Sequence, residues 1–198
     1  MISHQNHCLL KIDFFNAYNE IDRNTIIQAV AKSDSSITNI APCLHAMLSP
    51  QQKLCGFEDH FVTEDGTIQG CPISTMAFCI AVQPLLTEAY KNINKHHLQH
   101  KRDISDEEDT ESISLEDHEL GIASGFADDM YFGGTPEAVL WTFAKVTEMA
   151  KEIGLTINPA KCAIYARGDC LNTTRQTITN HSQQSCRDLR IGCLPNKD

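Results

Sequence analysis

The sequence predicts an α+β fold: an antiparallel sheet with helices packed on one face. The first observation is the order of the predicted elements, which runs strand, helix, helix, hairpin, helix, hairpin, helix, hairpin. The second is that most predicted strands are joined in pairs by short turns, which favours antiparallel pairing. The third is that the 198 residues are 41% apolar, enough for the core of one ordinary domain.

The first predicted elements follow from apolar spacing and turn residues. Residues 9–14 alternate as a strand, with Leu10, Ile12 and Phe14 on one face and Lys11 and Asp13 on the other. The next elements are a helix over 22–32, a second helix over 35–48 that Pro42 weakens, and a hairpin over 53–68 that turns at 64–66.

The later elements are predicted in the same way. Pro72 suits the first turn of a helix whose apolar body is 74–90. The remaining predictions are a strand–turn–strand over 119–132 turning at 127–129, an amphipathic helix over 136–153 ended by Gly154, a hairpin over 155–165 turned by Asn158-Pro159, and a short strand over 189–194.

The charge is concentrated in one segment. The net charge is -10, and the nine acidic residues between positions 101 and 119 account for most of it. We interpret residues 91–119 as a solvated acidic and His-rich insert or loop, and 167–187 as a polar, weakly structured tail. The predicted domain is therefore 1–166, followed by a tail over 167–198. The rest of the chain neither strongly repels polyanions nor forms a basic clamp for them.

Nine cysteines without a Cys-x-x-Cys pair predict reduced thiols, and small apolar fillers in the core are their simplest use. No apolar run approaches the roughly 20 residues of a membrane span, and residues 1–7 lack the features of a signal peptide. We therefore expect an intracellular protein, in the cytoplasm or nucleus, without a membrane partner.

Asp13 is unusual because it lies within an apolar strand and precedes Phe14. A carboxylate buried there would cost several kcal/mol unless it is paired or binds a metal. The alternatives are an Asp that faces water at the strand end, or one that pairs with Lys11.

Asp128 and Asp129 lie together at a predicted turn, which is also a common place for acids that have no chemical role. Adjacent carboxylates repel each other unless a cation lies close by. With Asp13 beside them, they would form an all-oxygen site of the Mg²⁺ type. Two such ions about 3.5–4 Å apart support in-line phosphoryl transfer.

Four blocks in order resemble the palm motifs of reverse transcriptases, in the style of non-LTR retrotransposon and group II intron enzymes. They are Lys-Ile-Asp-Phe-Phe-Asn-Ala-Tyr at 11–18, Gln-Gly-Cys-Pro-Ile-Ser at 69–74, Phe-Ala-Asp-Asp at 126–129, and Gly-Leu-Thr-Ile-Asn-Pro-Ala-Lys-Cys at 154–162. Residues 189–193 loosely resemble the following primer-grip strand.

The resemblance implies a role for each matching residue. Asp13 and Asp128 would be metal-ligating carboxylates, with Asp129 as the third acid and the Phe14 carbonyl completing one metal shell. Other roles would fall to Tyr18 as the sugar gate that favours deoxynucleotides, Gln69 and Gly70 at the incoming nucleotide and template, and Lys161 as a proton donor to the leaving pyrophosphate.

The implied activity is RNA-templated DNA synthesis by a retroelement enzyme. The implied cofactor is two Mg²⁺ ions, with Mn²⁺ as a substitute, and the partners are an RNA template, a DNA primer and dNTPs. The family's fingers segment before Asp13 and its thumb segment are not recognisable here, so we expect little activity from this chain alone. One alternative is a decayed, non-enzymatic palm remnant, and another is an RNA-templated RNA polymerase palm.

Overall fold

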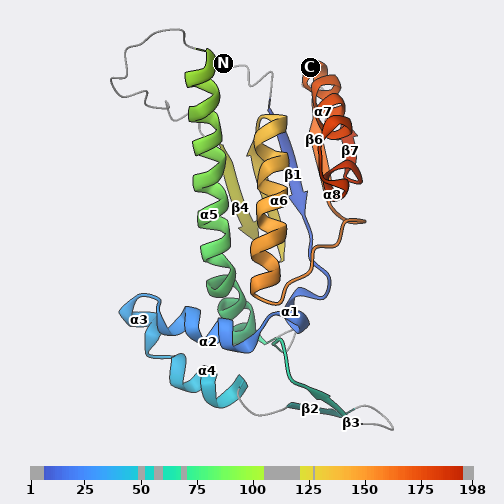
Figure 1. Cartoon of the computed structure of the whole chain (residues 1–198). Helices are drawn as coiled ribbons and strands as arrows, with labels where there is room; N and C mark the ends of the chain where they lie inside the picture. The colour runs from blue at the N-terminus through green and yellow to red at the C-terminus, as the bar shows by residue number, and fades with distance from the viewer. Residues whose placement is uncertain are drawn as a thin grey trace, which may run out of the picture.

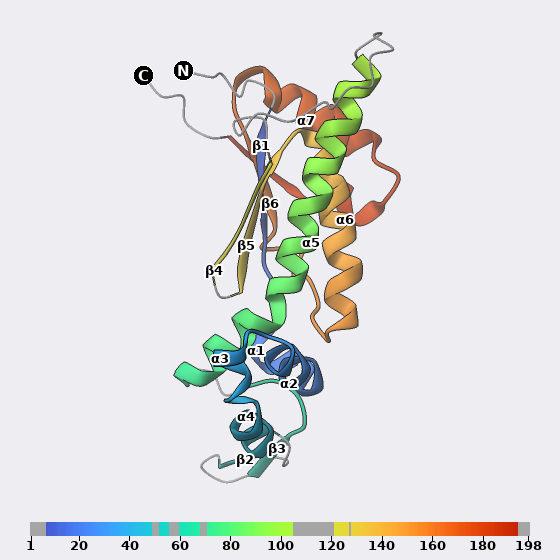
Figure 2. The ribbon, with the colours of Figure 1, turned by 90° about the vertical axis from the view of Figure 1, so that its left-hand side faces the viewer.

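The computed structural model describes residues 7–48, 52–55, 60–67, 71–104, 121–126 and 128–193. A five-stranded sheet forms the centre of the protein, and helices cover one face of this sheet (Figures 1 and 2). The strands are β1 (Cys8–Ile12), β2 (Gln52–Cys55), β3 (His60–Thr63), β4 (Ile122–Phe126), β5 (Asp129–Gly134), β6 (Ala163–Ala166) and β7 (Arg190–Cys193). The helices are α1 (Ala17–Glu20), α2 (Arg23–Ala31), α3 (Ser35–Thr38), α4 (Ala41–Leu48), α5 (Pro72–Ile104), α6 (Pro136–Glu152), α7 (Gly168–Asn180) and α8 (Gln184–Arg187).

The sheet has the strand order β4-β5-β1-β6-β7, with β1 at its centre. The pairs β4–β5, β5–β1 and β1–β6 are antiparallel, and only β6–β7 is parallel. Seen edge-on in Figure 2, α5 and α6 lie on one side of the sheet. The predicted α+β class, a mostly antiparallel sheet with helices on one face, is therefore confirmed.

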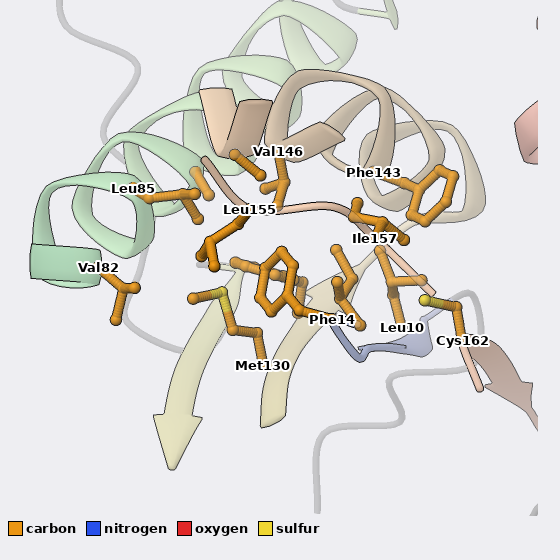
Figure 3. Packing of buried hydrophobic residues seen from close by; sticks show 14 of the residues in the cluster. Leu10, Phe14, Val82, Leu85, Met130, Phe143, Val146, Leu155, Ile157 and Cys162 are labelled. Atoms are coloured by element: carbon orange, nitrogen blue, oxygen red, sulfur yellow. The ribbon is translucent and has the colours of Figure 1, made fainter. Parts of the chain in front are cut away.

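The alternation of apolar and polar residues along β1 determines which face of the sheet the helices cover. Leu10 and Ile12 are fully buried toward the helices, and Phe14 continues this face beyond the strand end. Figure 3 shows Phe14 and Ile157 in this layer together with Met130 of β5. Lys11 and Asp13 therefore belong to the opposite face, where the described residues place no helix.

The strand–turn–strand prediction over 119–132 is confirmed for the described residues, because β4 and β5 pair with Phe126 opposite Asp129. The helix predicted over 136–153 is α6, which Thr135 caps by accepting a hydrogen bond from the Ala138 N–H. Gly154 follows with a φ of 80°, the left-handed conformation expected after a helix end.

Four small helices and the β2–β3 hairpin lie beyond one end of the sheet (Figure 1). The Asp22 carboxylate caps α2 by accepting from the Thr25 N–H at 2.7 Å. The single helix predicted over 35–48 is instead α3 and α4, and Pro42 lies in the first turn of α4, where its missing N–H costs little. The hairpin exists, but its register pairs Cys55 with His60, so 64–66 is not its turn.

The prediction of a loop from residue 91 is wrong for 91–104, because α5 continues through Ile104. Pro72 begins this helix, as predicted. Ile93 remains fully buried beyond the apolar body, which gives the polar extension an anchor. Elongating an existing helix avoids the cost of nucleation. Residues 105–119 of the predicted insert lie outside the described residues.

The hairpin predicted over 155–165 is also wrong. Ile157 instead forms an isolated bridge with Phe14, and β6 pairs with β1. The Asn158 carbonyl accepts from the N–H groups of Lys161 and Cys162, so 158–162 is a compact turn rather than a hairpin loop. The physical reason is that β1 offers a second edge, which β6 takes.

Residues 167–187, predicted to be weakly structured, instead contain the helices α7 and α8. In α7, Cys170, Thr174 and Ile178 recur every fourth residue and are all buried. The strand predicted over 189–194 is β7, Arg190–Cys193. None of the described helices combines the length and the apolar character needed to cross a membrane.

Candidate active site

Two carboxylates lie on the same face of the sheet, at one of its ends. The β1–β5 register pairs Lys11 with Tyr131 and Ile12 with Met130. One further step places Asp13 opposite Asp129. Residues opposite each other in an antiparallel pair share a face, so both carboxylates lie on the face away from the helices. The fold thus brings together two of the predicted acids that are 116 positions apart.

The backbone of Asp13 is held firmly by the segment before β6. Its N–H donates to Cys162 Sγ at 3.4 Å, and its carbonyl accepts from the Asn158 N–H at 2.9 Å. The Cys162 thiol also donates weakly to that carbonyl, at 3.7 Å. Burial raises the pKa of Cys162, so the sulfur stays a neutral thiol.

The Asp13 side chain is nearly buried but incompletely satisfied. Asp13 is 8% exposed, and its Oδ1 has no hydrogen-bond partner. Lys161 Nζ lies 3.7 Å from Oδ1, which is an ion pair but too long for a hydrogen bond. The ion-pair partner of Asp13 is therefore Lys161, and not Lys11 as one of the alternatives in the sequence analysis had it.

Asp129 has a closer partner than Asp13. Lys11 Nζ lies 2.9 Å from Asp129 Oδ1, and the hydrogen bond to this carboxylate raises the pKa of Lys11. Asp128 occupies the turn between β4 and β5 and is half-buried. Sequence reasoning missed the Lys11–Asp129 pair, although alternation along the strand already placed Lys11 on the face of Asp13.

Phe14 and Tyr18 lie just beyond β1. The bridge beside Phe14 uses hydrogen bonds from the Phe15 N–H to the Thr156 carbonyl and from the Asn158 N–H to the Asp13 carbonyl, so it leaves the Phe14 carbonyl outside the pairing. The Tyr18 ring stacks on Phe78 of α5 at a centroid distance of 4.7 Å. This contact fixes the plane of the Tyr18 ring.

The Gln-Gly-Cys-Pro-Ile-Ser block at 69–74 is only partly within the residues that the structure describes. Gln69 and Gly70 lie outside the described residues. Cys71 precedes Pro72 at the start of α5, and hydrogen bonds from the Ser74 and Ile73 backbone and the Ser74 side chain lower the pKa of its thiol.

The oxygens described above fit the predicted magnesium site only in part. The buried Oδ1 of Asp13, without a hydrogen-bond partner, is a ligand that a hard cation would accept. Across the described part of the chain, however, no three His, Cys, Asp or Glu side chains gather into a metal cluster. The side chains thus fit a cation at Asp13, while Asp129 is engaged by Lys11.

Comparison with solved structures supports the same fold. The chain is similar to apo telomerase from Candida tropicalis, with a TM-score of 0.56 and 12% identity over 82% of this chain and 29% of that chain. A form of that telomerase truncated from its C-terminal domain gives a TM-score of 0.55 and 13% identity, over 80% of this chain and 30% of that chain. The chain thus spans less than a third of the structures it matches, and at these identities the likeness concerns the fold alone.

No curated protein sequence matches this chain. The family model described as reverse transcriptase (RNA-dependent DNA polymerase) matches residues 1–187, almost the whole chain. This match agrees with the four sequence blocks and with the carboxylates that the sheet register brings together. The chain belongs to the reverse transcriptase family.

Proposed function

We propose that this chain carries the catalytic carboxylates of a retroelement enzyme that copies RNA into DNA. The observation that supports the proposal is the β1–β5 register, which ends at the Ile12–Met130 pair and, continued by one step, sets Asp13 opposite Asp129, beside the turn that holds Asp128. The Oδ1 atom of Asp13 is buried there and has no hydrogen-bond partner. The reaction joins a primer 3′-OH to the α-phosphorus of a dNTP and releases pyrophosphate.

Asp13 and Asp128, with the Phe14 carbonyl, would hold divalent cations, and Asp129 would lie beside them. Bound Mg²⁺ or Mn²⁺ would favour deprotonation of the 3′-OH and neutralise charge on the phosphates. The protein's own contribution is to position these oxygens. Asp13 is suited to this because its backbone N–H and carbonyl are both held by the 158–162 turn.

Two further side chains have roles in this proposal. The Lys161 side chain is 66% exposed, and its Nζ lies 3.7 Å from Asp13 Oδ1. It can therefore reach a pyrophosphate that leaves beside Asp13 and donate a proton to it. Tyr18 lies against Phe78, and its ring would exclude the 2′-OH of a ribonucleotide. Gln69 and Gly70 keep their proposed contact with the nucleotide and template on the sequence match alone.

The test is single-nucleotide extension of a DNA primer on an RNA template by the chain, with the primer–template in excess and a reaction time of hours. Slow, template-dependent dNTP incorporation is expected. Asp13→Asn should reduce it at least about 100-fold, because loss of a catalytic carboxylate costs several kcal/mol of transition-state stabilisation. Asp188→Asn, an exposed acid at the end of α8, is the matched control and should not change the rate.

The outcomes separate the three candidate functions. Incorporation that survives Asp13→Asn would contradict the proposed site. Equal use of rNTPs and dNTPs would favour an RNA-templated RNA polymerase. A wild-type chain without incorporation, alone and within any longer polypeptide that contains it, would favour a non-enzymatic remnant.

A further inference from the structure

The ion pair between Lys11 and Asp129 lies on the same sheet face as Asp13. Lys11 lies in β1, Asp13 directly follows the end of that strand, and the β1–β5 register, continued one step beyond the Ile12–Met130 pair, sets Asp13 opposite Asp129. The Nζ–Oδ1 distance is 2.9 Å, and the two side chains are 26% and 35% exposed. We propose that Lys11 is an internal counter-ion that occupies Asp129 and competes with a divalent cation for it. This inference rests on the proposed function and concerns the same site.

Lys11 is held in place more firmly than a surface lysine usually is. Its backbone pairs on both sides, opposite Tyr131 of β5 and Ala163 of β6. Its ammonium lies 5.9 Å from the centroid of the Tyr131 ring, within the range of a cation–π contact. Because the strand and the ring both restrict the side chain, the ion pair needs little further ordering.

Asp13 and Asp129 therefore differ in how readily each carboxylate can bind a cation. Asp13 Oδ1 has no hydrogen bond, and its nearest cation, Lys161, is 3.7 Å away on a side chain that is 66% exposed. Lys161 can leave without disturbing the sheet. Asp129 is engaged by a restrained lysine at hydrogen-bonding distance. A cation would thus bind at Asp13 first, and it would gain Asp129 only when Lys11 releases it.

The competing explanation is an ordinary cross-strand ion pair without influence on the site. The two explanations predict different cation affinities when a substitution removes the charge of Lys11. A counter-ion that blocks a ligand weakens cation binding, so its removal should tighten binding through Asp129 in particular. A merely structural pair would leave the affinity for the cation unchanged.

The experiment measures Mn²⁺ binding to the full chain from the EPR signal of free Mn²⁺, which requires no catalysis. Lys11→Met is expected to tighten Mn²⁺ about tenfold, because it removes a positive charge a few ångströms from the ion and frees an oxygen ligand. Asp129→Asn alone should change the affinity less than about threefold. In the Lys11→Met background, the same change should abolish the gain, which is the non-additivity expected of coupled residues.

Two controls isolate the effect. Lys145→Met breaks the Lys145–Glu148 pair, whose separation is 2.8 Å, and changes the net charge of the chain equally, so it should not alter Mn²⁺ affinity. Lys11→Arg keeps the charge and should bind Mn²⁺ as the wild type does. Circular dichroism and thermal unfolding confirm that each variant is folded, and Lys11→Gln replaces Lys11→Met if the latter is not.

The failure of the inference can be told from failure of the proposed function. Asp13→Asn should abolish Mn²⁺ binding, and unchanged binding in that variant would overturn the proposed site itself. If Asp13→Asn abolishes binding while Lys11→Met and Lys11→Gln stay within twofold of the wild type, the counter-ion inference is overturned. A gain that persists in the Lys11→Met, Asp129→Asn double variant would also overturn it.

Discussion

The sulfur of Cys162 lies between the backbone N–H and carbonyl of Asp13. It accepts from the N–H at 3.4 Å, and its thiol donates to the carbonyl at 3.7 Å. Cys162 is fully buried. A side chain that follows Lys161 by one position therefore fixes the backbone of a carboxylate 149 positions earlier in the chain.

We predict that Cys162→Ala lowers the free energy of unfolding by about 1–2 kcal/mol and weakens Mn²⁺ binding at Asp13. The stability loss follows from a small cavity and a backbone N–H without its acceptor. Urea unfolding and Mn²⁺ titration measure the two effects. Cys186→Ala is the matched control, because Cys186 is equally buried and its thiol donates weakly to the Leu140 carbonyl and Gln183 Oε1, away from Asp13. It should lose stability alone, and equal Mn²⁺ affinity in both variants would refute the positioning role.

Arg23 should be a major contributor to stability. Its guanidinium is buried and donates to the carbonyls of Gly66, Leu48 and Asp65 at 2.8, 3.2 and 3.1 Å. We predict that Arg23→Met lowers the free energy of unfolding by about 3 kcal/mol, because these acceptors lose their donors. Chemical denaturation measures it. Arg187→Met removes an exposed guanidinium and should cost less than about 0.5 kcal/mol. Similar losses in the two variants would contradict the prediction.

Gly154 is needed for two separable reasons. Its φ is 80°, and a Cβ there would lie 2.9 Å from the Glu20 carbonyl oxygen. Gly168 has a φ of 49° but no atom within 4 Å of a Cβ, so Gly168→Ala isolates the backbone strain. We predict losses of about 1 kcal/mol for Gly168→Ala and about 2–3 kcal/mol for Gly154→Ala. Thermal unfolding of both variants checks the difference, and equal losses would show that the α1–α2 junction moves aside at no cost.

Tyr18 should discriminate against ribonucleotides. Its stack on Phe78 fixes the ring, so we predict that Tyr18→Ala raises kcat/KM for an rNTP relative to the matching dNTP at least about tenfold. Tyr18→Phe keeps the ring and should keep the wild-type ratio. The ratio is measured by single-nucleotide extension with the chain or a longer polypeptide that contains it. An unchanged ratio in Tyr18→Ala would remove Tyr18 from the sugar gate.

Cys71 should be the most reactive of the described thiols near neutral pH. Hydrogen bonds from the start of α5 lower its pKa, so its thiolate forms at a lower pH than that of an ordinary cysteine. Its alkylation by iodoacetamide should therefore rise at a lower pH than that of a cysteine in an unstructured peptide. Peptide mass spectrometry gives each rate. Ser74→Ala removes one of these hydrogen bonds and should move the Cys71 profile toward higher pH.

Local rules predicted the elements next to the site well. Alternation identified the β1 face that carries Asp13, and the paired acids marked the β4–β5 turn. Both signals lie within a few residues of the chain, where periodicity and turn chemistry act. The tight placement of Asp13 beside Cys162 depends on a bridge between distant segments, which periodicity does not reveal.

The wrong predictions have a common physical origin in tertiary contacts. The polar end of α5 is helical because it continues an existing helix and buries Ile93. The buried face of α7 does not read as apolar in the sequence, because one of its buried residues is the polar Thr174. The hydroxyl of Thr174 lies 3.6 Å from Cys170 Sγ. A search for repeats every fourth residue that accepted Thr and Cys as core residues would have found this helix.

The Asn94 side-chain oxygen accepts from the Gly121 N–H at 2.8 Å, although the two residues are 27 positions apart. Gly121 can be replaced by no larger residue without a shift, because a Cβ there would lie 1.9 Å from Ile93. This hydrogen bond therefore ties the start of β4, the edge strand of the sheet, to the middle of α5. The long helix and the edge of the sheet thus keep their spacing through one polar contact and through a residue without a side chain.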